Sequence, residues 1–309
     1  MQSRLHQREQ LLMGNRFQLT VVADDEVYAA SCIDKAVNEI KRIEELLSTY
    51  KASSQTNLIN QHAGVKPVNV SDEVFQLIKR SVKISTLTQG AFDITYGSID
   101  KRFWNFDCNM TELPDPDTAK EMTRLINFRN IILDEEHSTV FLKEEGMRIG
   151  FGGIGKGYAA EMAKKVLIQL GIQNGIVNAS GDLTVWGKQP NGEPWTVGIA
   201  HPDLTEKAFA MMELKDSAVA TSGNYEKFVI INGKKYSHTI DPKTGMPVRG
   251  IKSVTIFSPN AEICDALATP VTIMGIQPSL HMVNQLHGVE CVIIDDDNKL
   301  YTSSNIHLS

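Results

Sequence analysis

Residues 150–171 read GFGGIGKGYAAEMAKKVLIQLG, a glycine cluster that leads directly into a helix ending at Gly171. MRIGF (147–151) in front of it is predicted to be a strand, and the strand-like segments GIVNA, DLTVWG, WTVGIA and AFAMMELK come after it. The stretch lies near the start of a sheet-rich part, about 129–309, that follows a helix-rich part, about 1–128. We predict a mixed α+β protein with mostly antiparallel sheets and flanking helices.

The rest of the chain supports this division. RFQLTVVA (16–23) alternates and reads as a strand, and Asn232–Gly233 predicts a hairpin in KFVIINGKKYSHTI. The predicted helices are about 26–50, capped by Asp24 and Asp25, the segment from Ser71 to Gly90, 114–128, 261–275 and 277–286. Further strands are predicted in NIILD, STVFLK, SVTIFS and ECVIIDDDNKLYTS. We expect a single domain over residues 1–309, or two closely packed lobes.

The composition is that of an ordinary globular protein, with 42% hydrophobic and 22% charged residues among 309. A net charge of −6 provides no broad basic field for nucleic acid or an anionic membrane, although a local basic pocket for phosphate stays open. The four cysteines are widely spaced and form no CxxC pair, so we expect buried thiols rather than a zinc site or a redox dithiol.

The sequence leaves the location of the protein open. No apolar run approaches the ~18 residues that span a bilayer. The opening MQSRLHQREQLLMGN lacks the apolar core and small-residue cleavage site of a signal peptide. We expect an extracytoplasmic protein, anchored to the membrane in the periplasm, if an export signal was removed, and a cytoplasmic one if the chain is complete.

The glycine cluster has two interpretations. Glycines between a strand and a helix let backbone N–H groups approach phosphate oxygens, and the segment from Gly150 to Lys156 fits the G-x-x-x-x-G-K part of a phosphate loop. Gly157 then stands where that loop needs Ser or Thr for magnesium. A tight structural turn is therefore the alternative, and Lys156 favours phosphate.

Two further segments combine a carboxylate with a structural alternative. In GAFDITYG (90–97), Phe92 and Asp93 could stack on a ring and accept hydrogen bonds from it, or serve as a core residue and a cap. In VNASGDLTVWG (177–187), Asp182 follows a small-residue turn, and an Asx-type turn would look the same.

ICDALATPVTIMG (263–275) offers hard oxygen ligands. Asp265 and Thr269 lie four residues apart, so on a helix they share one face. A carboxylate and a hydroxyl suit a magnesium ion that keeps waters and substrate phosphates. The alternative is that Asp265 caps a helix whose apolar body is core.

SHTIDPKTGMPV (237–248) follows a strand-like run and has a histidine near its start. Pro242 and Thr244–Gly245 mark a turn. A lone His238 is usually structural, but here it shares a short segment with Asp241 in a chain with candidate metal and phosphate sites.

Taken together, these segments resemble the ApbE family of FAD:protein FMN transferases. The matching motifs are LLMGN (11–15), LLSTY (46–50), QGAFD (89–93), GGIGKGYAAE (152–161), NASGD (178–182), ATSGNY (220–225), SHTIDPKTGMPV and DALAT (265–269). They occur in the family's order from residue 12 to about 275. Several short motifs in register over most of a chain are far more specific than any one of them, and they imply the family's T-fold-like architecture.

The resemblance implies a Mg²⁺-dependent enzyme. It would split the pyrophosphate of FAD, release AMP, and attach FMN through a phosphoester to a Thr or Ser of an acceptor flavoprotein. A cation bridging the pyrophosphate oxygens would neutralise the charge that develops at transfer. FAD would be a substrate and Mg²⁺ the cofactor, and the family's acceptors are membrane respiratory subunits or secreted flavoproteins.

The resemblance also assigns roles to individual residues. The FAD site would contain Met13, Tyr50, Ala91, Phe92, Asp93, Lys156, Asp182 and Thr239, with Lys156 at the pyrophosphate or a polar flavin edge and Thr239 beside the phosphates. Magnesium would be held by Asp265, Thr269 and the backbone carbonyl of Gly153. His238 would accept the proton of the acceptor hydroxyl, because an imidazole has a near-neutral pKa. Asp241, Pro242, Thr244 and Gly245 would shape the loop.

Three positions depart from the family pattern. The family usually has an Asp, thought to contact FAD, where this chain has Gly150. Ser180 replaces a usual glycine, and Asn15 replaces a usual threonine. None of these changes removes a magnesium ligand that the resemblance implies.

Two other functions remain open. A Mg²⁺-dependent FAD pyrophosphatase would use water in place of the acceptor hydroxyl and release FMN and AMP. A non-catalytic FAD-binding protein would release neither, and the presence of both Asp265 and Thr269 speaks against it. The identity of the acceptor protein and the oligomeric state are open as well.

Overall fold

A computed structural model of the chain describes residues 3–100, 112–201, 204–223, 228–231, 233–237 and 239–306. Its centre is an eight-stranded sheet in the order β1-β2-β6-β7-β10-β13-β14-β15, with antiparallel neighbours throughout. The strands are β1 (Arg4–Leu12), β2 (Asn15–Ala23), β6 (Gly175–Ala179), β7 (Asp182–Trp186), β10 (Ser217–Gly223), β13 (Ile251–Ser258), β14 (Glu290–Asp295) and β15 (Leu300–Thr302).

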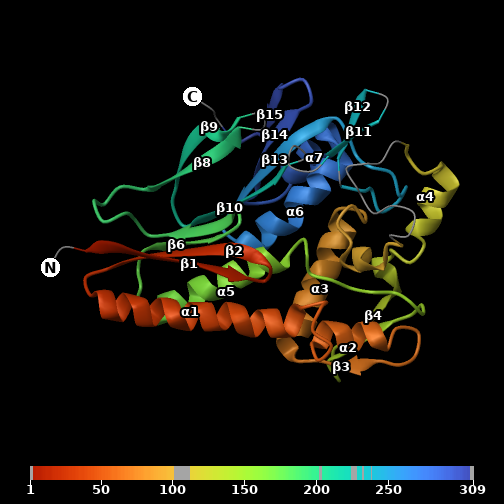
Figure 1. Ribbon diagram of the computed structural model, residues 1–309, viewed down its shortest axis with the longest axis horizontal. Helices are drawn as coiled ribbons and strands as arrows, with labels where there is room; N and C mark the ends of the chain where they lie inside the picture. Colours follow the sequence, from red (N-terminus) through yellow and green to blue (C-terminus); the bar gives the residue numbers. More distant parts are fainter. Residues whose placement is uncertain are drawn as a thin grey trace.

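Helices cover one face of this sheet and a hairpin covers the other (Figure 1). The helices on the first face are α1 (Glu26–Leu47), α5 (Gly155–Gln169), α6 (Ala261–Met274) and α7 (Ile276–Val283), and the hairpin is β8 (Trp195–His201) with β9 (Leu204–Leu214). Strand alternation divides the side chains between the two layers. In β7, Trp186 belongs to the core under the helices, whereas Leu183 and Val185 pack under the hairpin.

A smaller body lies beside α6 and ends at the right of Figure 1. It contains α2 (Gln55–Gln61), α3 (Asp72–Leu87), η1 (Ile94–Ser98), α4 (Pro116–Met122) and η2 (Phe128–Asn130), together with a sheet of β3 (Val68–Asn69), β5 (Thr139–Leu142) and β4 (Ile131–Asp134). The hairpin of β11 (Phe228–Ile231) and β12 (Lys234–Ser237) is also separate from the main sheet. This hairpin confirms the one predicted in KFVIINGKKYSHTI; Asn232 of its turn lies outside the described residues.

The sequence explains why the main helices form where they do. Asp25 caps α1 by accepting a hydrogen bond from Tyr28 N, and Ser71 caps α3 through Val74 N. An apolar stripe on α1, which includes Ile33, Val37, Ile40 and Leu47, is buried. Each such aliphatic side chain contributes roughly 1.5–3 kcal/mol when it leaves water, so the stripe fixes the face that α1 turns to the sheet.

Two predicted elements were wrong. MRIGF (147–151) is not a strand: Ile149 N donates to the Asn60 side chain and Gly150 N to Ile94 O, so these groups are satisfied without a ladder partner. The helix predicted over 114–128 is only α4, which ends at Met122.

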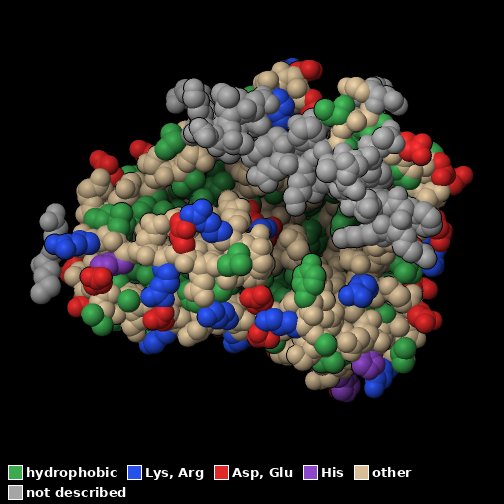
Figure 2. Space-filling view, in the orientation of Figure 1, with side chains coloured by type: hydrophobic (Ala, Val, Ile, Leu, Met, Phe, Trp, Pro, Cys, Tyr) green, Lys and Arg blue, Asp and Glu red, His purple; other side chains and the backbone are tan. Residues whose placement is uncertain are grey.

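The outer surface carries charges of both signs. Figure 2 shows Lys, Arg, Asp and Glu side chains interspersed over α1 and the β1–β2 hairpin. Ion pairs such as Arg8 with Asp34 join neighbouring elements there. Among the described residues, the helices are too short or too polar to cross a membrane.

Candidate functional site

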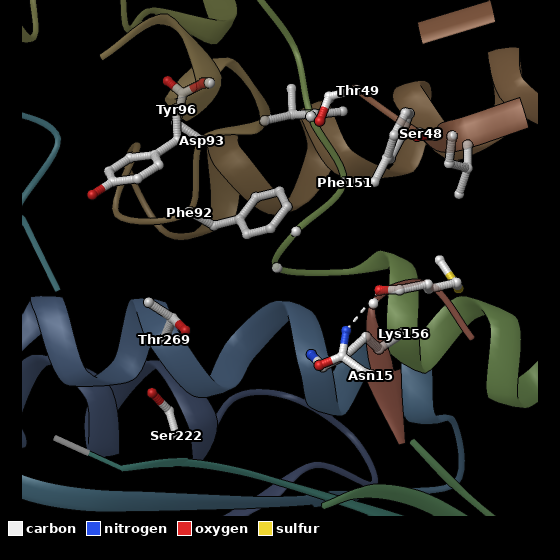
Figure 3. A pocket seen from close by; sticks show the side chains of 18 of the residues that line it. Asn15, Ser48, Thr49, Phe92, Asp93, Tyr96, Phe151, Lys156, Ser222 and Thr269 are labelled. Carbon is white, nitrogen blue, oxygen red and sulfur yellow. Dashed lines mark hydrogen bonds between the residues drawn. The ribbon is translucent and has the colours of Figure 1, made fainter. Parts of the chain in front are cut away.

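A cavity of about 810 Å³ lies where the helix layer of the main sheet meets the smaller body. Of the residues assigned to the site from the sequence, Met13, Tyr50, Ala91, Phe92, Asp93, Gly153, Lys156, Thr239 and Thr269 line it. Figure 3 shows Phe92 and Tyr96 on one side of the cavity and Lys156 and Thr269 on the other. Asp182 and Asp265 lie behind the wall in contact with Lys156. His238 lies outside the described residues.

The glycine cluster forms both a wall of the cavity and the start of α5. Gly155 N donates to Phe151 O at 2.7 Å, which closes a tight turn before the helix. A Cβ at Gly157 would lie 2.1 Å from Ala261 O, so the close approach of α5 and α6 requires glycine there. The Ser or Thr of a nucleotide phosphate loop would not fit at this position. The structural interpretation therefore accounts for Gly157, while Lys156 one residue earlier reaches the cavity.

Lys156 joins two buried carboxylates from different elements. Its Nζ lies 2.6 Å from Asp182 Oδ2 on β7 and 3.2 Å from Asp265 Oδ1 on α6. The contact with Asp265 is a hydrogen bond, and Asp265 Oδ2 accepts a second one from Gly157 N at 2.9 Å. The contact with Asp182 is an ion pair without hydrogen-bond geometry, since Oδ2 accepts no hydrogen bond from the described residues.

The charges of this cluster perturb one another. Burial, and then the charge of Asp265, raise the pKa of Asp182 to about 7, against the lowering effect of Lys156. Burial alone would lower the pKa of Lys156, but Asp265 and Asp182 together raise it above its ordinary value. Lys156 therefore stays a cation at neutral pH, and the cluster carries a cation between two acids.

The predicted magnesium ligands come from α6 and the glycine cluster. Asp265 and Thr269 are one helical turn apart on α6, and Thr269 and Gly153 both line the cavity. Among the described residues, no group of three or more His, Cys, Asp or Glu side chains is placed to hold a metal. The predicted set is of another kind, with one carboxylate, one hydroxyl and one backbone carbonyl, all hard oxygen donors that suit magnesium.

Asp93 borders the cavity but uses its oxygens as a cap. Oδ1 accepts hydrogen bonds from the N–H and hydroxyl of Thr95, and Oδ2 accepts one from Phe128 N at 3.0 Å. Burial raises the pKa of Asp93, while these hydrogen bonds oppose the rise. The cap anticipated as the alternative for Asp93 is thus present. Phe92 is buried with its ring toward the Gly153 side of the cavity.

The β1–β2 turn and the segment after α1 form another part of the cavity rim. Met13 and Gly14 both have positive φ, as a two-residue hairpin turn requires, and Met13 N donates to Glu44 Oε2 at 3.1 Å. This bond anchors the turn to α1. Tyr50 is 98% exposed and lines the cavity, so its ring is free to contact a bound molecule.

The loop after β12 forms the turn predicted for it. Asp241 Oδ1 accepts a hydrogen bond from Lys243 N, and Gly245 N donates to Asp241 O at 2.9 Å. A Cβ at Gly245 would lie 1.9 Å from Ala119 O, which seats the turn against α4. Thr239, at the start of this loop, is buried and lines the cavity.

Sequence reasoning missed several lining residues. Tyr96, Ser222 and Thr49 line the cavity inside or beside motifs that were recognised, yet were not singled out. Tyr96 lies three residues after Asp93, and burial raises its pKa to about 12. The 3₁₀ turn η1 that brings Tyr96 back to the cavity leaves no periodic pattern, so only its place in GAFDITYG indicated it.

Comparisons with known proteins agree with this architecture. A model of the ApbE family matches residues 13–293. The chain is 29% identical over 304 residues to the FAD:protein FMN transferase of Klebsiella pneumoniae (strain 342), covering 98% of this chain and 93% of that protein. It is also 29% identical over 321 residues to the FAD:protein FMN transferase of Treponema pallidum (strain Nichols), covering 98% and 88%.

Solved structures give the same result. The ApbE protein of Thermotoga maritima superposes with a TM-score of 0.86 at 28% identity, covering 97% of both chains. The flavin transferase ApbE of Vibrio cholerae superposes with a TM-score of 0.82 at 25% identity, covering 98% of both. Fold and cavity thus define a protein of the flavin-transferase architecture, which confirms the predicted fold class. The chain belongs to the ApbE family, as its motifs indicated.

Proposed function

We propose that this protein is a FAD:protein FMN transferase. The observation that carries the proposal is the cavity, where an aromatic wall faces a cation and a hydroxyl across a space of about 810 Å³. Relatives with that name match 98% of the chain. A flavin ring needs flat apolar contacts, which the wall with Phe92 provides, and a pyrophosphate needs positive charge, which Lys156 provides on the other wall.

In this proposal each wall binds one part of FAD. Phe92 and the exposed Tyr50 contact the flavin, and Lys156 attracts the pyrophosphate. Magnesium fits the oxygen donors of Asp265, Thr269 and Gly153, and it would neutralise the pyrophosphate charge when bound. Asp182 supports this fit, because its buried Oδ2 accepts no hydrogen bond from the described residues and adds negative charge beside Asp265.

The transfer step is a displacement at phosphorus. The hydroxyl oxygen of an acceptor Thr or Ser bonds to the FMN phosphorus, the phosphorus–oxygen bond to the AMP half breaks, and AMP leaves with that oxygen. His238 is the base that we propose for the hydroxyl proton. Thr239, the next residue in the chain, lines the cavity, and its N–H donates to Ser237 Oγ.

One assay tests the proposal. The protein is incubated with FAD and Mg²⁺, with and without an acceptor flavoprotein that carries a Thr or Ser target, and AMP and protein-bound flavin are measured. AMP together with flavin on the acceptor supports a transferase. AMP without any acceptor indicates a FAD pyrophosphatase, and bound FAD without AMP indicates a binding protein.

The same assay tests the oxygen ligands. Asp265→Ala should reduce AMP release at least ~100-fold, because the carboxylate next to the pyrophosphate is lost. Lys120→Ala, at an exposed position of α4, is the control and should retain the wild-type rate. AMP release by Asp265→Ala at the wild-type rate would rule out this assignment.

A further inference from the structure

The cluster behind the cavity wall is short of positive charge. Asp182, Lys156 and Asp265 come from β7, α5 and α6, and their side chains are 8%, 23% and 7% exposed. With both acids ionised, one ammonium faces two carboxylates and one negative charge is left over. Buried charge is costly unless it is paired, so the cluster favours the arrival of a further cation.

Lys156 occupies the place that such a cation needs. Asp265 Oδ2 accepts a hydrogen bond from Gly157 N, and Oδ1 accepts one from Lys156 Nζ, so the ammonium group lies directly against Oδ1. A cation that approaches Oδ1 therefore meets the positive charge of the ammonium group, which opposes its binding. The backbone contact cannot move without separating α5 from α6, whereas a lysine side chain has four rotatable bonds.

The side chain of Lys156 can also turn toward the cavity. Its side chain is the most exposed of the three and lines the cavity. The longer of its two contacts is the 3.2 Å bond to Asp265, so a small movement frees that carboxylate while Asp182 stays close. An anion held in the cavity would provide the new partner, and a nucleotide pyrophosphate is such an anion.

We propose that Lys156 is an exchangeable counter-ion: without substrate it pairs with Asp182 and Asp265, and a nucleotide pyrophosphate draws it into the cavity and opens Asp265 to a divalent cation. The nucleotide step rests on the proposed function. The consequence is positive coupling, in which metal binds weakly alone and more tightly with nucleotide, and by reciprocity the nucleotide also binds more tightly with metal.

Metal binding without nucleotide tests the counter-ion role. Calorimetric titration with Mg²⁺ would compare the wild type, Lys156→Met and Lys156→Gln, the last of which keeps hydrogen-bond donors for the carboxylates. Both variants should bind Mg²⁺ at least ~10-fold more tightly than the wild type, because a competing charge has been removed. Circular dichroism verifies folding. Unchanged or weaker Mg²⁺ binding by the folded variants overturns the proposal.

Lys164 provides a matched control on the same helix. Its Nζ lies 3.8 Å from Glu161 and 3.0 Å from Thr184 Oγ1, and its side chain is also largely buried. Lys164→Met should therefore show the Mg²⁺ affinity of the wild type. An equal gain in Lys164→Met and Lys156→Met would mean a general charge effect and would count against a specific exchange.

The coupling is measured with an FAD analogue whose pyrophosphate bridge is a methylene group, so that it is not cleaved. In the wild type the analogue should tighten Mg²⁺ binding at least ~10-fold, and in Lys156→Met less than ~3-fold. Binding of the analogue without any change in Mg²⁺ affinity overturns the exchange. Failure of the wild type to bind the analogue, seen by flavin fluorescence, would instead overturn the proposed function and the nucleotide step with it.

Discussion

At the scale of single residues, Asp182 shows how local geometry creates an unusual carboxyl group. Ser180 and Gly181 both have positive φ and make the two-residue turn between β6 and β7, so Asp182 is the first residue of β7. Its side chain points to the helix-covered face, where it meets Lys156 at 2.6 Å. Burial there and the charge of Asp265 raise its pKa to about 7.

This pKa predicts a pH dependence of stability in the metal-free protein. The ordinary pKa of 3.8 applies to the unfolded chain, so between pH 3.8 and about 7 the folded protein holds a proton that the unfolded chain has lost. The free energy of unfolding should therefore fall as pH rises through this window, by about 1–4 kcal/mol, and level off above the folded pKa.

Urea unfolding of the wild type and Asp182→Asn between pH 5 and 8, with a chelator present, measures the effect. The variant cannot ionise at this position, so its stability should fall less over the same range. Other titrating groups are common to both proteins and cancel in the difference. Parallel curves for the two proteins would show that Asp182 is already ionised at pH 5.

The sequence identified Lys156, Asp182 and Asp265 individually but not their contact. Turn chemistry and helix spacing are local, and both were recognised in NASGD and DALAT. The contact depends on β7, α5 and α6 meeting in three dimensions, over separations of 26 and 109 residues between Lys156 and its two partners. Local patterns carry no information on such a meeting, so only the family resemblance placed these residues in one site.

At the scale of elements, the junction of α5 and α6 positions the predicted metal ligands. Glu161 Oε1 accepts a hydrogen bond from Ala261 N at 2.9 Å, which joins α5 to the first turn of α6. One turn earlier, Gly157 N donates to Asp265. The two bonds hold α6 at a fixed height along α5, so Asp265 and Thr269 face the cavity wall together.

Gly157→Ala should break this junction. Its Cβ would lie 2.1 Å from Ala261 O, a backbone atom that can move only with α6. We expect the free energy of unfolding to fall by about 2–3 kcal/mol, although alanine favours helix more than glycine does. Gly152→Ala is the control, since its Cβ would meet no atom within 4 Å, and it should change stability by less than ~0.5 kcal/mol. Equal effects of the two substitutions in chemical denaturation would contradict the close approach.

Other elements show where sequence patterns fail. β1 was not predicted, because an edge strand with one hydrogen-bonded neighbour needs no apolar alternation, and its side chains from Arg4 to Leu11 are mostly polar or exposed. MRIGF has the apolar alternation of a strand, yet a side-chain amide and η1 satisfy its backbone. Local patterns thus predicted most helices and strands of this fold but missed the edge strand β1, because strand pairing depends on which backbone partner is nearby.

At the scale of the whole molecule, the cavity depends on how the smaller body is fixed to the main sheet and its helices. Arg80 on α3 forms a two-point ion pair with Glu262 in the first turn of α6, with Nε to Oε1 at 2.6 Å and Nη2 to Oε2 at 3.0 Å. Its guanidinium also lies 5.8 Å from the ring of Tyr158 on α5. Tyr158 in turn donates to Glu73 on α3. The ion pair and the contacts of Tyr158 together hold α3, α5 and α6 next to one another beside the cavity.

Arg80→Met should loosen this connection and weaken the site at a distance. Glu262 is 6% exposed and would lose its partner, so we expect the free energy of unfolding to fall by about 2–3 kcal/mol. This loss is smaller than for a fully buried pair, because the Arg80 side chain is 40% exposed. The double variant Arg80→Met/Glu262→Gln should recover part of the loss, since it leaves no unpaired charge. Arg124→Met removes an exposed pair with Glu121 and should cost less than ~0.5 kcal/mol. Chemical denaturation measures the stability of all three variants.

Flavin fluorescence should also show weaker FAD binding in Arg80→Met, because the two cavity walls belong to the parts that the Arg80–Glu262 pair connects. FAD affinity equal to that of Arg124→Met would mean that the walls keep their spacing without this ion pair.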